Sequence, residues 1–292
     1  MLHLLYTFCD ELWLFGCKCG GDVEEAARLM NKTFTACLTD RTASLHDSRR
    51  MGVHMVFSKL LKAYFHLGQF RLAKNAILAL KVCELPPLEA VAKSHAVSFH
   101  FFLAVYHFVE GEWGRALELF DYALVNCHPK ALKNGQLILH FLVPLRLAVQ
   151  GKYPAVELLR RYKLLHVYAE LLACVASGNV SGFRQQLAMN AEFFIKLGTF
   201  LCVESLEFLC CRNLVKAVFE QKQQQQQNEK SCKMPLEVLL RCWKFACKLE
   251  SVEMLHLECV VANLIGMGLV KGYIAHERQF LVLSQNDPFP VL

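Results

Sequence analysis

Apolar residues recur along the first two thirds of the chain in a phrase that repeats four times. Each phrase has a glycine, a large apolar residue two positions later and another apolar residue three positions after that. The phrases begin at Gly68, Gly111, Gly151 and Gly178. A glycine at such a point ends one helix in a left-handed turn, and the following helix packs back against the first. The pattern predicts a mainly α, TPR-like solenoid whose helical hairpins bury their apolar faces against one another.

Helix-breaking glycines and prolines, together with the spacing of apolar residues, predict the individual helices. Residues 22–39 read as an amphipathic helix with Asp22 as its N-cap. Residues 1–20 are apolar but irregular, with three glycines, and no element is predicted there. We expect further helices over about 52–67, 69–82, 88–109, 112–126, 130–149, 153–161, 163–177, 180–197 and 199–220.

The pattern changes after residues 221–230, which are polar and rich in glutamine. Such a tract can serve as an interaction segment, but we favour a tolerated expansion in a surface linker. Beyond it we expect helices over 235–249 and 253–267, then two short strands over 269–276 and 279–283. Helices followed by a β-hairpin are typical of a winged helix. The predicted organisation is an unassigned segment (1–21), a helical-repeat domain (22–220), a Gln-rich linker (221–232) and a winged-helix domain (233–292).

Composition limits the class of protein. Hydrophobic residues make up 54% of the 292 residues, enough for a large core. No apolar stretch reaches the roughly 18 to 20 residues that a bilayer requires, and the start lacks the basic region of a secretory signal. We therefore expect a soluble intracellular protein without membrane insertion.

The 14 cysteines are scattered, mostly within apolar helical runs. This distribution favours buried, reduced thiols over a disulfide framework. Zinc sites need paired ligands such as two Cys-x-x-Cys knuckles, and the sequence has none. No structural metal and no cofactor are expected.

The formal net charge of +6 is unevenly placed. Residues 41–93 and residues 130–163 each carry a surplus of six positive charges. In the second segment Tyr153 and Tyr162 lie among the cations, an arrangement suited to phosphates rather than base edges. A solvated face, or a dock for an acidic protein, is the competing interpretation. The candidate nucleic-acid-binding residues in this segment are Lys130, Lys133, Arg146, Lys152, Arg160, Arg161 and Lys163.

The predicted winged helix does not look like a DNA reader, because residues 254–267 contain no Lys or Arg. Lys271 and Arg278, on the predicted hairpin, remain candidates for phosphate contacts. We favour pairing with a partner's winged helix through the apolar surface and the hairpin edge. The candidate partner-binding residues are Lys244, Lys248, Tyr273, Phe280 and Phe289.

Nothing in the sequence assembles a reaction centre. His95, His100 and His107 share one predicted helix, without a carboxylate or cysteine at matching spacing, and read as packing or capping residues. Gly-rich phosphate loops, Gly-x-Ser-x-Gly and His-Glu-x-x-His are absent. The 21 phenylalanines favour core packing over a cofactor pocket. We expect a non-enzymatic protein.

Helical repeats that run into one C-terminal winged helix are the architecture of PCI-domain proteins. Local stretches over about residues 25–292 carry a closer resemblance. They are Leu29–Phe34, Cys37–Arg41, Leu60–Phe65, Asn134–Gly151, Val156–Tyr162, Ala262–Ile274 and Asn286–Pro290. These stretches resemble the PCI domain-containing protein 2 family within that group, although the glutamine tract and the N-terminus depart from it.

The resemblance implies a scaffold subunit of the nuclear transcription-coupled mRNA-export complex, which docks at the nuclear pore. It also implies two partners: a larger PCI scaffold protein and a small acidic subunit shared with the proteasome lid. A related branch of the family contains a signalosome-associated subunit, so the alternative is a signalosome-like or proteasome-lid-like adaptor that binds proteins only. A helical-repeat enzyme is the third class, and it would require a polar pocket with perturbed titratable groups.

Overall fold

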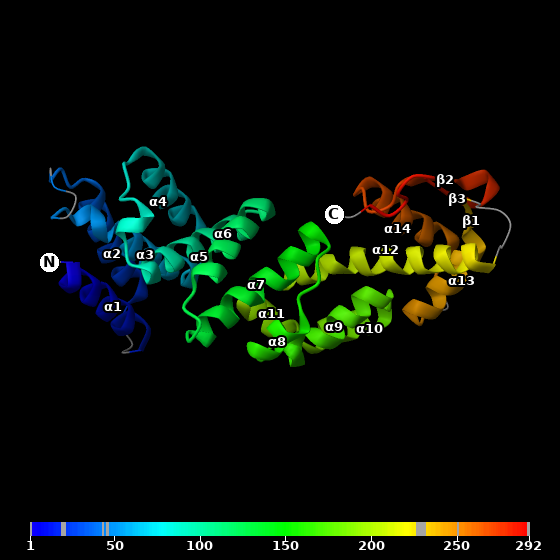
Figure 1. Cartoon of the computed structure of the whole chain (residues 1–292), viewed down its shortest axis with the longest axis horizontal. Coiled ribbons are helices and arrows are strands. Elements are labelled where there is room, and N and C mark those ends of the chain that lie inside the picture. The colour runs from blue at the N-terminus through cyan, green and yellow to red at the C-terminus, as the bar shows by residue number, and fades with distance from the viewer. Residues whose placement is uncertain are drawn as a thin grey trace. The chain divides into compact units, whose positions relative to one another are not determined.

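The computed structural model describes residues 2–18, 22–42, 44, 47–225, 232–249 and 251–290. The chain forms two compact units, residues 1–139 and 140–292. Helices dominate both, which confirms the mainly α prediction (Figure 1). Among the described residues, no helix combines the length and apolarity that crossing a membrane would need.

The first unit consists of paired helices around an aromatic core. Phe34, Phe57, Leu60 and Phe99 lie in that core, and the rings of Phe57 and Phe99 are 5.3 Å apart. Two 3-10 turns, η1 (Arg49–Gly52) and η2 (Leu88–Ala90), precede α3 and α5. The helices are α1 (Leu2–Lys18), α2 (Val23–Leu38), α3 (Val53–His66), α4 (Phe70–Val82), α5 (Lys93–Val109), α6 (Trp113–Asn126) and the start of α7 (Leu132–Gln150).

The N-terminal helix corrects the prediction that residues 1–20 are irregular. Residues 2–18 form α1, which packs on α2 and α3, and Cys9 is fully buried. Two of the glycines that suggested a break, Gly20 and Gly21, fall outside the described residues. The third, Gly16, lies inside the helix, where a Cβ would be 3.2 Å from the Cα of Val23. A close approach between helices therefore explains this glycine, rather than a break.

The second unit contains the rest of α7 and a long helix, α12, against which the shorter helices pack. The predicted helix over 180–197 is interrupted at Asn190, which caps the end of α10 and precedes α11. The elements are α8 (Val156–Arg161), α9 (Leu165–Ser177), α10 (Val180–Met189), α11 (Ala191–Leu197), α12 (Phe200–Gln225), β1 (Lys233–Pro235), α13 (Leu236–Cys247), α14 (Met254–Gly266), β2 (Gly272–Ala275), the 3-10 turn η3 (His276–Arg278) and β3 (Phe280–Leu283).

The four repeated glycines all adopt the left-handed backbone that the phrase predicts, with φ between +63° and +78°. Two helices nevertheless start later in the chain than the sequence analysis predicts. The chain forms η2 at 88–90 before α5 begins at Lys93, and α8 begins at Val156 rather than near residue 153. The N-cap prediction at the other end of the array is confirmed, since the Asp22 carboxylate accepts a hydrogen bond from the Glu24 backbone N–H at 2.8 Å.

The three strands form one antiparallel sheet in the order β1-β3-β2. The predicted hairpin corresponds to β2 and β3, which pair with Tyr273 opposite Val282. The additional strand β1 pairs with β3 in the register Met234 to Leu281, and both side chains are fully buried. Half-buried and buried positions alternate along β3, as expected for a strand with one face toward the core.

The glutamine-rich segment is partly helical. α12 continues to Gln225, five residues beyond the predicted end at 220, and packs against α13. Residues 226–231 of the predicted linker lie outside the described residues. Whether the winged-helix region forms a domain separate from the repeats stays a prediction.

Candidate nucleic-acid and partner surfaces

The end of α8 shows how the local sequence displays cations. Lys163 takes a positive φ of 55°, its N–H donates to Arg160 O at 3.1 Å, and the Leu164 N–H donates to Leu159 O at 2.8 Å. This is the bonding pattern of a helix that ends in a left-handed residue. Leu159 and Leu164 are buried, so they fix the turn while the cations between them project outward.

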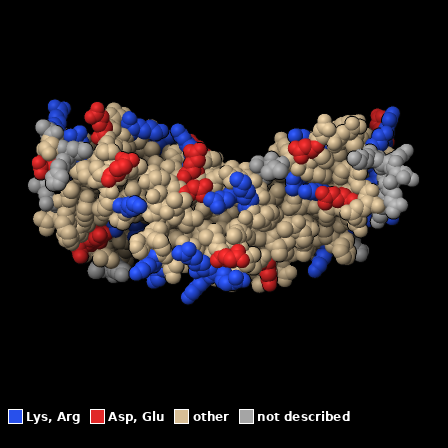
Figure 2. All heavy atoms as spheres, in the orientation of Figure 1, with Lys and Arg blue, Asp and Glu red and all other residues tan. Residues whose placement is uncertain are grey.

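Three cations at this turn, which we call the α8 cluster, are exposed: Arg160, Arg161 and Lys163. None of them forms an ion pair with a described residue. By contrast, Arg184, Lys196 and Lys216 are each paired with a glutamate. Two of the cluster's cations lie in the last turn of α8, where the helix dipole favours positive charge. Figure 2 shows Lys and Arg side chains gathered over the region that contains α8.

The two interleaved tyrosines have different surroundings. The guanidinium of Arg161 lies 5.6 Å from the ring centre of Tyr162, within cation–π range. Tyr153 is partly exposed, and its hydroxyl accepts a hydrogen bond from the Asn213 amide at 3.5 Å. Burial raises the pKa of Tyr153, so the phenol stays neutral at physiological pH. Tyr153 is thus hydrogen-bonded to α12, whereas Tyr162 lies beside the guanidinium of Arg161.

The remaining predicted cations of this segment are not gathered into the α8 cluster. Lys130 and Lys133 are exposed before and at the start of α7, in the first unit. Arg146, near the end of α7, is half-buried and has an interaction partner of its own. Lys152 is exposed shortly after the end of α7, so only Arg160, Arg161 and Lys163 form one local group.

At the predicted wing, one cation is neutralised and the other is not. Lys271 lies 3.4 Å from the carboxylate of Asp287 in an exposed ion pair. Arg278 lies in η3, between β2 and β3, and is exposed without an ion-pair partner among the described residues. Of these two candidates, Arg278 offers the available positive charge.

A groove of about 1300 Å³ runs between α12 and α13 in the second unit. Leu214 and Val218 line it from α12, while Lys244 and Lys248 lie on the α13 side. Lys248 does not continue the helix, as the prediction of a helix to residue 249 assumed, but caps it in a left-handed conformation with φ 54°. Both lysines nevertheless border the same groove.

The strongest apolar feature of this surface, Phe245, was missed from the sequence. Its side chain is 87% exposed and lines the groove beside the two lysines. Val238, Cys242 and Leu249 occur at helical spacing from it, and Val238 and Leu249 are also exposed apolar residues. This spacing is visible in the sequence, but it resembles an ordinary core-facing stripe, because the buried stripe of Leu236, Leu239 and Trp243 runs alongside it.

The three aromatic residues predicted to bind a partner differ in exposure. Tyr273 on β2 is 61% exposed, and Phe280 on β3 is half-buried. Phe289 is buried, with its ring 6.0 Å from that of Phe219. The Arg212 guanidinium donates to the carbonyls of Phe289 and Pro290 at 2.8 and 3.0 Å. Phe289 therefore fastens the C-terminal segment to α12 and offers no ring to a partner.

The predicted packing role of two histidines on α5 agrees with their contacts. His100 Nδ1 lies 2.8 Å from Ala96 O and its ring stacks on Tyr122 at 3.8 Å. His107 contacts the carboxylate of Glu112 at 2.8 Å, across the turn that follows α5. No group of three potential metal-ligating side chains comes together in the described part of the chain.

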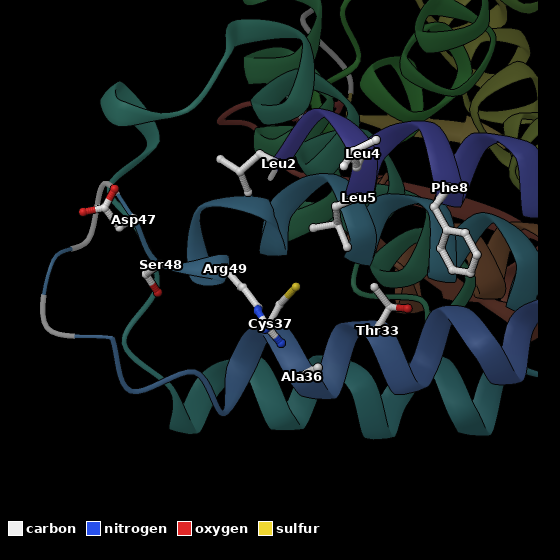
Figure 3. A pocket seen from close by; sticks show the side chains of 10 residues that line it. All are labelled: Leu2, Leu4, Leu5, Phe8, Thr33, Ala36, Cys37, Asp47, Ser48 and Arg49. Carbon is white, nitrogen blue, oxygen red and sulfur yellow. The ribbon is translucent and has the colours of Figure 1, made fainter.

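A cavity of about 400 Å³ in the first unit is lined by Leu5 and Phe8 of α1, Cys37 of α2, and Arg49 (Figure 3). Burial raises the pKa of the Cys37 thiol to about 11, so it stays protonated and is a poor nucleophile at neutral pH. Arg49 donates its backbone N–H to Asp40 at 2.6 Å, and this bond holds the pKa of Asp40 down to about 2. The Asp40 contact thus anchors the loop before α3, and the Cys37 thiol offers no activated nucleophile to the cavity.

Comparison with known proteins identifies the family. PCI domain-containing protein 2 of Xenopus laevis is 31% identical to the chain over 275 residues, which cover 94% of this chain and 66% of that protein. The PCI domain-containing protein 2 homolog of Drosophila melanogaster is 30% identical over 99% of this chain and 72% of that protein. This chain belongs to the PCI domain-containing protein 2 family.

The family includes relatives with a second name. Protein CSN12 homolog of Schizosaccharomyces pombe is 33% identical over 92% of this chain and 62% of that protein. The chain spans just under two thirds of the length of the Xenopus and Schizosaccharomyces relatives. No protein-family model matches the chain. These matches confirm the resemblance stated from the sequence and assign the chain to PCI-domain subunits.

Proposed function

We propose that the chain is a non-enzymatic scaffold subunit of a PCI-type nuclear mRNA-export complex. In this role it pairs with a larger PCI scaffold protein and a small acidic subunit, and contributes part of a basic surface for RNA. Family membership supports the scaffold role, and the observation that carries the RNA role is the α8 cluster. Three exposed cations without acidic partners among the described residues, held on a turn that buried Leu159 and Leu164 anchor, suit a run of phosphates.

The groove between α12 and α13 is our proposed site for the small acidic subunit. An extended acidic segment with an aromatic or aliphatic residue matches its features, because Lys244 and Lys248 supply charge while Leu214, Val218 and Phe245 supply apolar surface. Tyr273, exposed on the outer strand β2, is the proposed contact for the larger partner. A strand at the edge of a sheet has backbone groups free to pair with another chain.

Reconstitution with the purified partners tests this assignment. The chain is mixed with a larger PCI protein of the export complex and the small acidic subunit, and assembly is followed by size-exclusion chromatography. The double variant Lys244→Glu and Lys248→Glu should lose the acidic subunit but keep the larger partner. A matched control, Lys196→Glu with Lys216→Glu, makes the same charge change elsewhere in the second unit and should keep both. Retention of the acidic subunit by the groove variant would contradict the proposed site.

The relatives called CSN12 homolog favour a second candidate, a signalosome-like adaptor that binds proteins only. The two functions differ in the complex that the tagged chain enters in cells. Affinity purification followed by mass spectrometry should recover export and nuclear-pore factors if the export role is right. Recovery of signalosome subunits, without RNA crosslinks to the α8 cluster, would support the adaptor instead.

A further inference from the structure

A second cavity of the first unit, about 420 Å³ in volume, lies among α1, α3, α5 and α7. Its lining residues on α3, at positions 55, 58, 59 and 62, follow helical spacing and so share one face. The lining residues on α5 run from Ser94 to Phe102 and also recur at helical spacing. A volume of this size is within the range of small-molecule sites.

One wall of the cavity is basic. Lys59 forms an ion pair with Asp10, and Lys62 places its Nζ 4.2 Å from the ring centre of Trp13. Asp10 is the only acidic side chain among the described residues that line the cavity, so two lysines share one carboxylate. Burial and the charge of Lys59 lower the pKa of Lys62, and Asp10 opposes this change only in part.

His95 also lines the same cavity. Its Nδ1 is shielded from solvent and has no hydrogen-bond partner in the described part of the chain, while its ring packs edge-on against Tyr6 at 4.7 Å. Burial and the charge of Lys59 lower the pKa of His95, so a neighbouring anion would favour its protonation.

Much of the remaining lining is apolar and forms what we call the apolar wall. Val97, Phe101 and Phe102 of α5 face the cavity, together with Leu137 and Ile138 of α7. A free inorganic anion would leave this wall in contact with water, and an uncharged apolar molecule would leave the basic wall unpaired. The lining is therefore complementary to a molecule with one anionic end and one apolar or aromatic end.

We propose that this cavity binds a small phosphate ester with an aromatic body, of the size of a nucleoside monophosphate. The phosphate contacts Lys59, Lys62 and His95, with the Ser94 hydroxyl as a further donor, and the aromatic body packs against Val97, Phe101 and Phe102. A phosphate group matches this wall better than a carboxylate, because it offers three terminal oxygens to donors from two helices. The site goes beyond the proposed scaffold function, which uses surfaces of the second unit.

Isothermal titration calorimetry with adenosine 5′-monophosphate tests the proposal on the full chain. We expect saturable binding of this probe, with adenosine and inorganic phosphate each binding at least about tenfold more weakly. Absence of saturable binding at millimolar probe would overturn the proposal. So would adenosine or inorganic phosphate binding as tightly as the complete nucleotide, because one of the two walls would then contribute nothing.

Two variants probe the two walls independently. Lys62→Met keeps the length of the side chain over Trp13 but removes its charge, and should weaken binding at least about tenfold. Val97→Phe fills the apolar side without changing any charge, and should weaken binding similarly. The control Lys74→Met removes an exposed charge from α4 and should leave the affinity unchanged. Lys62→Met with unchanged affinity, in a protein that unfolds at the temperature of the control, would refute the site even if Val97→Phe failed to fold.

The site can be tested separately from RNA binding. Charge reversal at Arg160, Arg161 and Lys163 should leave nucleotide binding by the cavity intact. Loss of nucleotide binding in that variant would mean that the nucleotide occupies the α8 cluster, and would overturn the cavity proposal.

Discussion

The hydroxyl of Tyr168 donates a hydrogen bond to the backbone carbonyl of His140 at 3.0 Å, inside the second unit. In an uninterrupted helix that carbonyl would accept from the N–H four residues later, but residue 144 of α7 is proline and has no N–H. Tyr168, from α9, is fully buried, and its hydroxyl replaces the missing N–H as the donor to this carbonyl. The hydroxyl thus compensates for a helix-interior proline through a contact between two helices.

Replacing Tyr168 by phenylalanine should destabilise the protein by about 1–3 kcal/mol, because the His140 carbonyl would lose its partner in a buried position. The cost should shrink in a Pro144→Ala background, where the restored N–H of residue 144 can bond to the same carbonyl. Urea denaturation of the four proteins in this double-mutant cycle measures the coupling. Tyr64→Phe is the control, since the hydroxyl of this largely buried tyrosine has no hydrogen-bond partner among the described residues. An equal cost of Tyr168→Phe in both backgrounds would contradict the compensation.

Gly178 should be the least replaceable of the repeated glycines. A Cβ at this position would lie 2.6 Å from the Cα and N of Leu214, because the turn between α9 and α10 packs directly on the backbone of α12. Gly111 has a similar φ of +78° but nothing within 4 Å of its missing Cβ, so Gly111→Ala isolates the backbone strain. We expect about 1–2 kcal/mol for Gly111→Ala and at least about 1–3 kcal/mol more for Gly178→Ala. Urea denaturation measures both, and equal costs would show that the close packing is unimportant.

The comparison of these glycines shows what the sequence could and could not predict. The recurring phrase predicts all four left-handed turns, because a helix end of this kind depends on local backbone conformation. It does not distinguish Gly178 from Gly111, since the contact with Leu214 joins residues that lie far apart in sequence. Strand β1 was missed for the same reason: its three residues gain their partners only from β3, almost fifty residues later.

The candidate site also contains some residues that local sequence predicts and others that depend on tertiary packing. The run around Arg160, Arg161 and Lys163 was visible because the cations are adjacent in sequence, and their turn is closed by local hydrogen bonds. Phe245 was overlooked, and Phe289 was predicted to contact a partner, because the exposure of an aromatic ring depends on tertiary packing. Phe289 packs against Phe219 of α12, and its carbonyl accepts a hydrogen bond from Arg212 of the same helix. Phe245 stays exposed among the described residues.

Charge reversal of the α8 cluster should weaken RNA binding by the assembled complex. In the variant Arg160→Glu, Arg161→Glu and Lys163→Glu, we expect a similar loss for unrelated single-stranded RNA sequences, because phosphate contacts carry no sequence information. The slope of log K against log salt concentration should flatten by about 2, at roughly 0.7 per lost phosphate contact. Fluorescence anisotropy at several salt concentrations measures both quantities.

The control for this experiment reverses Arg71, Lys74 and Lys81 on α4, which are exposed residues of the other basic segment. It changes the net charge by the same amount. If both triple variants weaken RNA binding equally, the effect reflects overall charge and the α8 cluster has no special role. Unchanged affinity in the α8 variant would remove these residues from the RNA-binding surface.

Acid should destabilise the fold through His54, which is buried on α3 with its ring against Phe99 at 4.8 Å. Its Nδ1 has no hydrogen-bond partner among the residues that the structure describes. Burial lowers the pKa of His54 to about 4, whereas an unfolded histidine titrates near about 6.5. Between these values the unfolded state binds the proton and the folded state does not, so stability is lost as pH falls through this window. The loss should approach about 1.4 kcal/mol per pH unit for this histidine. Burial also lowers the pKa of His140 to about 4, which adds a change of the same sign.

Substituting His54 by leucine should remove this part of the pH dependence and leave the contribution of His140. The test is the free energy of urea unfolding measured from pH 7 to pH 4.5, a window that stays above the titration of Asp40, whose pKa is about 2. The control His256→Leu replaces an exposed histidine on α14 and should preserve the dependence of the unmodified chain. If His54→Leu loses stability with acid as steeply as that control, His54 must already be protonated or solvated in the folded state, and its burial cannot explain the acid sensitivity.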